Sequence, residues 1–325
     1  MNPIQLPALH IPFPSAINQH FETVNQHSLD WMRSFNLVTD ELVYQRWCGV
    51  QIPLGAALFA PSASLEALEI VSDFFLWGYL IDDQFEKAGI SKQPEILESM
   101  HARFVDIFNG ASLTDADTPF AFALQDFCQR LHQQPHWTPE LMLHFVKNVE
   151  DYFQSVRWEA TNNSQGIKLN VAAHIKLREF TIGLRPFLNL TFITEQIALP
   201  TEVIEHPMVE RLNQLTCNTV AWTNDIFSVK KDISQGCVQN NLVFSLQNEH
   251  QLSLQEALER AAEMLNAEVA SFIELSAQLP SFGNEIDTNL QGYLSGLRSW
   301  MRGTVDFYLE SPRYRLTKTT SAAPC

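Results

Sequence analysis

The stretch from residue 221 to residue 232, AWTNDIFSVKKD, decides how the rest of this chain is interpreted. In a helix each residue turns about 100° around the axis, so Asn224, Ser228 and Asp232, spaced four apart, share one face. That face presents an amide oxygen, a hydroxyl and a carboxylate, which are hard ligands suited to Mg²⁺ rather than to zinc or copper. Lys231 stands beside Asp232 and could meet an anion held by the metal. The stretch therefore predicts a helix that carries a magnesium site.

A second acidic group lies upstream, in residues 79–86, YLIDDQFE. Asp82 and Glu86 are four residues apart on one helix face, and Asp83 lies beside them. Two like charges at this spacing cost about a few tenths of a kcal/mol, and a cation between them would turn the repulsion into binding. The preceding residues, 71–81, are almost wholly apolar and aromatic. An apolar helix that ends in carboxylates suits a hydrophobic substrate with an anionic head group, held through a metal ion.

The two motifs give the chain a resemblance to a known family, the microbial class I terpene synthases. DDQFE, from Asp82, is similar to the family's aspartate-rich motif in its DDxxE form, and NDIFSVKKD, from Asn224, resembles its second metal motif, NDxxSxxxE. Their separation, 224 − 82 = 142 residues, is about what the family shows. One position departs from the pattern, because Asp232 stands where the family usually has the longer glutamate. The metal would then sit nearer the helix or bind through a water.

Further matches bring the resemblance to roughly residues 70–315. Arg178 lies 224 − 178 = 46 residues before Asn224, where the family keeps a diphosphate-sensing arginine, and Arg313–Tyr314 resembles its terminal arginine–tyrosine pair. The sequence QNNLV at 239–243 is similar as well. The resemblance implies that a helix break after Arg178 supplies a linker residue, Thr181, and an effector carbonyl, Ile182.

The implied fold is an all-α, single-domain helical bundle around a central apolar cavity, with three Mg²⁺ ions at the cavity mouth. The implied metal ligands are Asp82, Asp83, Glu86, Asn224, Ser228 and Asp232. The residues expected to meet the diphosphate are Arg178, Lys231, Arg313 and Tyr314. The aromatic residues expected to line the substrate cavity, where their ring quadrupoles could stabilise cations, are Phe74, Trp77, Tyr79, Phe187, Trp300 and Phe307.

Composition agrees with one helical domain. The chain has 325 residues, 46% of them apolar, and only 12 glycines, and it lacks alternating runs bounded by turn residues that would indicate strands. We expect a domain over residues 1–315, with an extended strap at 1–18 marked by prolines, and a disordered polar tail at 316–325. Helices are expected over about 62–86, from Gln93, and from Thr138 through Trp158. The segment 168–197 should be a helix interrupted near Gly183 and Pro186, and residues 20–60 should form one or two helices.

Charge and cysteine usage restrict the partners. The net charge is 21 − 37 = −16, which argues against nucleic acid or an anionic membrane as partner and means that an anionic substrate needs metal ions. No apolar run is long enough for a membrane span, and no signal peptide is evident. Five scattered cysteines without CxxC spacing indicate free thiols. Free thiols indicate a cytoplasmic protein, and we expect a monomer or homodimer. The loop 233–240, which contains Gly236 and follows the helix with the second motif, is expected to act as a lid.

Each signal alone has a simpler explanation, and alternatives stay open. The acidic residues could be a solvated helix end, Arg178 could pair with Glu179, and the aromatics could be ordinary core. The presence of all the motifs in this order and spacing favours a cyclase that acts on a linear prenyl diphosphate. We expect C15 farnesyl diphosphate ahead of the C10 and C20 substrates. A germacrane or eudesmane hydrocarbon is a guess at the product. The rivals are a prenyl chain-elongating synthase, which would carry a second aspartate-rich motif, and a helical scaffold without activity.

Overall fold

The computed structural model describes residues 4–87, 89, 93–235 and 240–311. Its first seven helices are α1 (Phe21–Ser34), α2 (Glu41–Val50), α3 (Ile52–Phe59), α4 (Leu65–Lys87), α5 (Pro94–Phe108), α6 (Pro119–His132) and α7 (Pro139–Ser164). The remaining helices are α8 (Val171–Thr181), α9 (Leu184–Thr194), α10 (Thr201–Ile204), α11 (Pro207–Gln235), α12 (Leu242–His250), α13 (Leu254–Ala277) and α14 (Asn284–Glu310). No strand occurs in these ranges, so the predicted all-α class is confirmed.

Most predicted helix boundaries agree with local capping chemistry. The Ser64 hydroxyl accepts a hydrogen bond from the Ala67 amide one turn into α4, and Thr138 caps α7 by accepting from the Leu141 amide. Both side chains satisfy amide groups that have no partner within the helix. Residues 20–60 form three helices rather than the expected one or two, because Gln51, with φ of 53°, turns the chain sharply between α2 and α3.

The predicted interruption of the segment 168–197 is confirmed, and its cause is Gly183. Gly183 adopts a left-handed conformation with φ of 69° between the end of α8 and the start of α9, a conformation that costs other residues about 1–2 kcal/mol. Pro186 lies inside the first turn of α9, where its missing N–H would have no helical partner. The proline therefore fits the new helix and does not cause the break.

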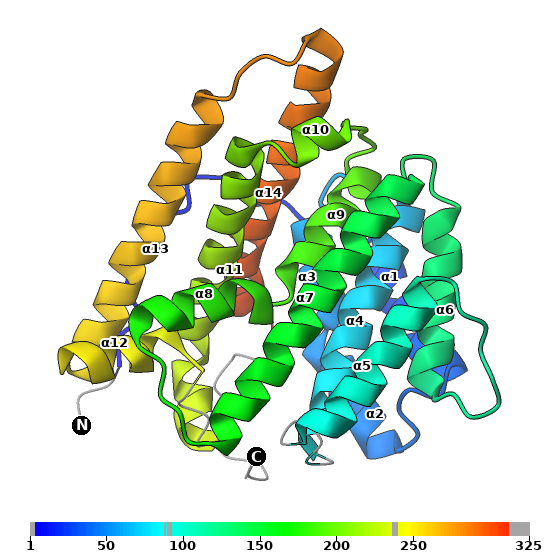
Figure 1. The fold of residues 1–325 in the computed structure, drawn as a ribbon, viewed down its shortest axis with the longest axis horizontal. Coiled ribbons are helices and arrows are strands. Elements are labelled where there is room, and N and C mark those ends of the chain that lie inside the picture. Colours follow the sequence, from blue (N-terminus) through cyan, green and yellow to red (C-terminus); the bar gives the residue numbers. More distant parts are fainter. Residues whose placement is uncertain (1–3, 88, 90–92, 236–239, 312–325) are drawn as a thin grey trace.

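The helices surround a common interior, as Figure 1 shows. Helix α3 packs on α4 and α14, α11 packs on α14, α9 and α8, and α13 covers the outer side of α11 together with α12. In Figure 1, α8 lies across the bundle at the end where the C-terminal parts of α4 and α11 also lie. The break after α8 and the two acidic motifs are thus at the same end of the bundle.

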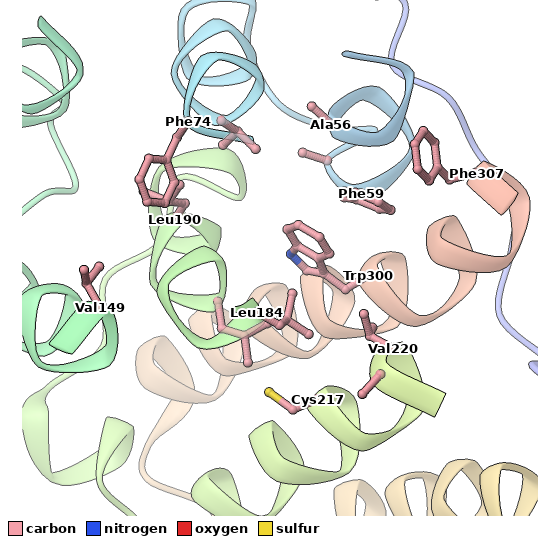
Figure 2. Packing of buried hydrophobic residues seen from close by; sticks show 14 of the residues in the cluster. Ala56, Phe59, Phe74, Val149, Leu184, Leu190, Cys217, Val220, Trp300 and Phe307 are labelled. Atoms are coloured by element: carbon pink, nitrogen blue, oxygen red, sulfur yellow. The ribbon is translucent and has the colours of Figure 1, made fainter. Parts of the chain in front are cut away.

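A glycine lets α14 approach α3 closely. A Cβ atom at Gly303 would lie 2.5 Å from the carbonyl oxygen of Leu58, closer than real Cβ atoms come to backbone. The approach lets Trp300 of α14 stack on Phe59 of α3, with ring centroids 4.2 Å apart. Figure 2 shows these rings, with Phe74 and Phe307, directed toward one interior from α3, α4 and α14.

The N-terminal segment 4–18 contains neither helix nor strand, and it is held along α13. The Gln5 amide donates to the Gln255 side chain, and the His10 amide donates to Asn266 Oδ1 at 2.7 Å. The expected division into a domain over 1–315, a strap and a tail stays a prediction. Arg313 and Tyr314, expected at the diphosphate, lie outside the described residues, as do residues 236–239 of the predicted lid. Residues 233–235 of that predicted lid belong to α11, which ends at Gln235.

Candidate active site

A cavity of about 300 Å³ lies in the centre of the bundle, at the small end of the range of roughly 300–1,000 Å³ for ligand pockets. The structure brings all six predicted aromatic residues to its wall: Phe74, Trp77, Tyr79, Phe187, Trp300 and Phe307. Aromatic residues that were not predicted also line it, namely Phe59, Phe75, Phe108, Tyr152, Phe153 and Tyr308. Sequence spacing indicated that α4 is apolar, but only packing decides which rings face the interior.

The rings form a continuous wall. Phe187 of α9 lies 5.0 Å from Phe74 and 5.5 Å from Trp300, measured between ring centroids, and Phe75 lies 5.6 Å from Phe187 with its plane nearly perpendicular. Tilted and edge-to-face pairs of this kind are favoured by the ring quadrupoles. The cavity therefore offers the negative faces of aromatic rings from several directions.

One part of the cavity wall is polar. Asp82 of α4, Arg178 of α8, and Asn224 and Lys231 of α11 all line it, as does Tyr308 of α14. The first four were predicted as site residues, and the fold brings them together although they are up to about 150 residues apart in sequence. Tyr308 was not predicted. Its hydroxyl accepts a hydrogen bond from the Asn224 amide.

The second motif forms the expected face of α11, supplemented by Asn241, the residue immediately before α12. The Ser228 hydroxyl donates to Asp232 Oδ2 at 2.7 Å, and the Asn241 side chain donates to the same carboxylate oxygen at 2.9 Å. Burial raises the pKa of Asp232, although the two hydrogen bonds lower it in part. A cation beside this carboxylate would relieve the cost of its burial. Asn224 lines the cavity, whereas Ser228 and Asp232 do not.

Arg178 is anchored at the base of the site by a buried aspartate. Its Nε donates to Asp225 Oδ1 at 3.0 Å, and a terminal nitrogen donates to Asn224 Oδ1 at 2.7 Å. Asp225 is only 1% exposed, and His174 Nε2 lies 3.4 Å from its other oxygen. Burial lowers the pKa of Arg178, but the Asp225 and Glu159 carboxylates more than offset this, so the net pKa is raised. Asp225 stands inside the motif, yet nothing in the sequence gave it a role.

The first acidic motif is divided. Asp82 faces the cavity, and Tyr152 of α7 donates to Asp82 Oδ1 at 3.4 Å. Asp83 is directed to another partner, because Arg46 of α2 lies 2.9 Å from its carboxylate, and Asp83 does not line the cavity. The side chain of Glu86 lies outside the described residues. A single sequence carries no signal for the contact between α2 and α4 that engages Asp83.

The helix break reaches the cavity wall. Thr181, Ile182 and Gly183 all line the cavity, and the Ile182 amide donates to the carbonyl oxygen of Arg178. The Tyr152 ring packs on the break, so that a Cβ atom at Gly183 would lie 3.2 Å from it. Arg178 and the break are thus joined through backbone, and Tyr152 joins the break to Asp82.

The residues fit a divalent metal with oxygen ligands. Asn224, Ser228 and Asp232 supply amide, hydroxyl and carboxylate oxygens on one helix, a donor set that suits Mg²⁺. Among the described residues, no three His, Cys, Asp or Glu side chains gather into a metal site. A metal at α11 would therefore depend on the amide and hydroxyl oxygens as well as on the single carboxylate. At Asn224, the metal would replace the contact with Arg178.

Comparison with known proteins decides the family. Residues 73–271 match the family model described as terpene synthase family 2, C-terminal metal binding. The chain belongs to this family. A germacrene A synthase of Nostoc punctiforme is 36% identical to this terpene synthase over 314 residues, which is 97% of this chain and 96% of the relative. A (+)-T-muurolol synthase of Roseiflexus castenholzii, described as cyclising (2E,6E)-farnesyl diphosphate, is 34% identical and covers 94% of this chain and 93% of its own.

Solved structures agree on the fold of the terpene synthase. A crystal structure of a-eudesmol synthase superposes with a TM-score of 0.84, covering 93% of this chain and 99% of that one, at 19% identity. The predicted family, fold and enzyme class are confirmed. The family description also states that its C-terminal part binds metal. Within the described ranges, none of the helices is both long and apolar enough to span a membrane.

Proposed function

We propose that this terpene synthase ionises farnesyl diphosphate and cyclises the resulting carbocation to a sesquiterpene, with release of diphosphate. One observation carries the proposal: a cavity walled by aromatic rings has Asp82, Arg178, Asn224 and Lys231 in its polar part. The two relatives support the C15 substrate, because one is named for a sesquiterpene, germacrene A, and the other for cyclising farnesyl diphosphate. A germacrane or eudesmane hydrocarbon is the product class that we test first.

The cofactor in this proposal is Mg²⁺, with three ions as the family resemblance implies. Asp82, with Asp83 and Glu86, would hold two of them, and Asn224, Ser228 and Asp232 would hold the third. When bound, the ions supply positive charge that stabilises the departing diphosphate. Asp83 would have to exchange Arg46 for a metal to take part, whereas Asp82 already faces the cavity.

The side chains of the chain itself hold the leaving group and shelter the cation. A guanidinium can donate two parallel hydrogen bonds to a diphosphate, which favours Arg178 for recognition, and Asp225 fixes its Nε so that the terminal nitrogens are directed toward Asn224 and the cavity. Lys231 adds a second cation on the cavity wall. Arg313 and Tyr314 stay proposed diphosphate donors by resemblance. The aromatic wall stabilises positive charge and excludes water that would quench it.

The cell compartment and assembly are also proposals. Cys48, Cys128 and Cys217 are free thiols in the structure, which supports an enzyme of the reducing cytoplasm, acting as a monomer or homodimer.

The decisive experiment is to incubate purified enzyme with the C10, C15 and C20 prenyl diphosphates and Mg²⁺ and to analyse the headspace by gas chromatography–mass spectrometry. We expect sesquiterpenes from the C15 substrate and none in EDTA. Isopentenyl diphosphate in a parallel reaction tests the chain-elongating alternative, which would yield longer diphosphates instead. A volatile product from the C10 or C20 substrate alone would overturn the proposed substrate, and no product from any of them would overturn the proposed function.

A further inference from the structure

Asn241, the residue immediately before α12, occupies a position that its role as a helix cap does not explain. Its side-chain oxygen accepts from the Val243 amide at 2.8 Å, which is the ordinary N-cap interaction. Capping residues normally lie at the surface, and Asn170, which caps α8 in the same way, is exposed. Asn241 is instead 1% exposed, and its side chain contacts the C-terminal part of α11.

The amide nitrogen of Asn241 is directed at the second motif. It lies 2.7 Å from the Asp225 carbonyl oxygen, 2.9 Å from Asp232 Oδ2 and 3.3 Å from the Ser228 hydroxyl. The orientation of the amide is fixed by its partners, because the Val243 N–H can only donate, and the Asp225 carbonyl and the Asp232 carboxylate can only accept. Asn241 therefore donates to the carboxylate that ends the motif.

A second contact fastens α12 to the same place. The Leu242 amide donates to Asp225 Oδ2 at 2.9 Å, so that neighbouring residues at the start of α12 bind both the main chain and the side chain of Asp225. At the far end of this helix, Glu249 accepts from the Val171 amide at the start of α8. Helix α12 is thereby attached to the two helices that carry Arg178 and the second motif.

The short side chain of Asp232 explains why the hydrogen bonds from Ser228 and Asn241 matter. Aspartate reaches one methylene less far than glutamate, so the position of its oxygens depends strongly on what holds them. Ser228 and Asn241 hold the same oxygen, Oδ2, and neither hydrogen bond engages Oδ1. Groups that donate to a metal-binding carboxylate in this way orient it, and their loss typically reduces metal affinity by about 10–100-fold.

We propose that Asn241 is a positioning residue for the metal site of α11, setting the orientation of the Asp232 carboxylate and the Ser228 hydroxyl through its amide N–H. The inference rests on the proposed function, since it assumes that these oxygens bind Mg²⁺. The capping oxygen of Asn241 holds α12, and its nitrogen transmits the position of α12 to the metal ligands.

The test separates capping from positioning. Serine is as good an N-cap as asparagine but is too short to reach Asp232, so Asn241→Ser should keep the cap and lose the donor. Asn170→Ser is the matched control, because it makes the same exchange at an exposed cap whose side chain binds the Ala173 amide and not a residue of the motif. For each protein, Mg²⁺ is titrated at fixed inorganic diphosphate, and the melting temperature is recorded with and without metal.

We expect Asn241→Ser to need at least about ten-fold more Mg²⁺ than wild type for half-maximal stabilisation, while Asn170→Ser titrates like wild type. Asn241→Thr, another capping residue whose side chain is too short to reach Asp232, covers the case in which the serine variant fails to fold, and it should also need more Mg²⁺. If a folded Asn241 variant titrates at the wild-type concentration, the inference is wrong. If wild type gains no stability from Mg²⁺ with diphosphate, the proposed metal site itself fails.

Discussion

Two buried aspartates in this enzyme bind the same types of residue, a histidine and an arginine, but lie in different parts of the molecule. Asp73 of α4 is fully buried and is bound by His27 Nε2 at 2.9 Å and by Arg130 at 2.7 Å. Asp225 of α11 is bound by a histidine, His174, and an arginine, Arg178. Each carboxylate also accepts a further hydrogen bond, from the Ser28 hydroxyl and from the Leu242 amide respectively.

The two clusters differ in what else the arginine side chain contacts. Arg130 also binds Asp126 at 2.9 Å and lies over the Trp31 ring, so it ties α6 to α4 and α1. Arg178 lines the cavity and reaches Asn224. A buried carboxylate with an arginine and a histidine is thus no sign of function by itself, since it also serves to join helices. The position of the guanidinium at the cavity wall is the reason why we propose a functional role for the Asp225 cluster and a structural role for the Asp73 cluster.

The strongest test of this comparison exchanges each arginine for lysine. Lysine keeps the charge but loses the planar fork that binds a diphosphate and a carboxylate together, so Arg178→Lys should reduce kcat by about 100-fold or more. Arg130→Lys should lower the melting temperature and leave kcat per folded molecule near wild type. Both quantities are measured on the same preparations.

A stably folded Arg178→Lys enzyme with wild-type kcat would remove Arg178 from the site, and with it the roles proposed for Thr181 and Ile182. A large loss of kcat in folded Arg130→Lys would show that the two clusters are not functionally distinct.

Ligand binding should also separate the clusters. Diphosphate with Mg²⁺ should stabilise the native state by about 2.7 kcal/mol at a hundred times Kd, and more than either component alone, because the net charge of −16 opposes an anion without metal. Hydrogen exchange should show added protection in α8 and α11 and little change in α1. Equal stabilisation by diphosphate in EDTA would contradict a metal-dependent site.

The fold and much of the site could be predicted from sequence because they depend on local patterns. Helix periodicity and capping residues act within a few residues, and they located α4 and α7. The break near Gly183 and Pro186 was expected from the proline, whereas the structure shows that Gly183, with φ of 69°, causes it. Asn224, Asp82 and Arg178 were assigned to one site by the resemblance of their motifs and spacing to a known family, and all three line the cavity.

The remainder depends on contacts between distant segments. Arg46 engages Asp83 from another helix, and Tyr152 reaches Asp82 across the cavity end. Asp225 and Asn241 stand within the motifs quoted from the sequence, but their roles follow only from burial and from their partners. Those partners are on α8 and α12 for Asp225 and on α11 for Asn241. A charged residue next to the apolar Ile226 and Phe227 is the sequence signal that could have drawn attention to Asp225, because a charge on an apolar helix face requires a partner.

A smaller effect is expected at the break beside the Asp225 cluster. Alanine at Gly183 must adopt φ near 69° and brings its Cβ within 3.2 Å of the Tyr152 ring, which in turn binds Asp82. We expect a stability loss of roughly 1–2 kcal/mol and a fall in kcat on the order of ten-fold, because the Tyr152 and Asp82 side chains would be displaced.

Gly166→Ala is the matched control, because Gly166 has φ of 64° and open space around it. This variant should lose stability and keep the wild-type kcat. Unfolding by denaturant and steady-state kinetics distinguish the two variants, and equal kcat in both would argue against a link between the break and Asp82.

The smallest expected effect concerns the structural cluster and pH. Burial lowers the pKa of His27, but its hydrogen bond to Asp73 and the charges of Asp73 and Glu69 outweigh this and the repulsion of Arg130, so its pKa is raised above 6.5. The protonated form is therefore favoured by folding. The resulting stability is fully present below about pH 6.5, the pKa of the unfolded state, and is lost as pH rises through the folded-state pKa.

His27→Gln should accordingly lower the melting temperature by on the order of 1–2 °C at about pH 6 and by less at about pH 8.5. The effect is small because the His27 side chain is partly exposed, so its interaction with Asp73 is screened. The comparison is made on metal-free protein, so that the Asp225 cluster contributes equally to both melting curves. A gap between wild type and variant that is the same at both pH values would show that His27 joins α1 to α4 through a neutral hydrogen bond and not through its charge.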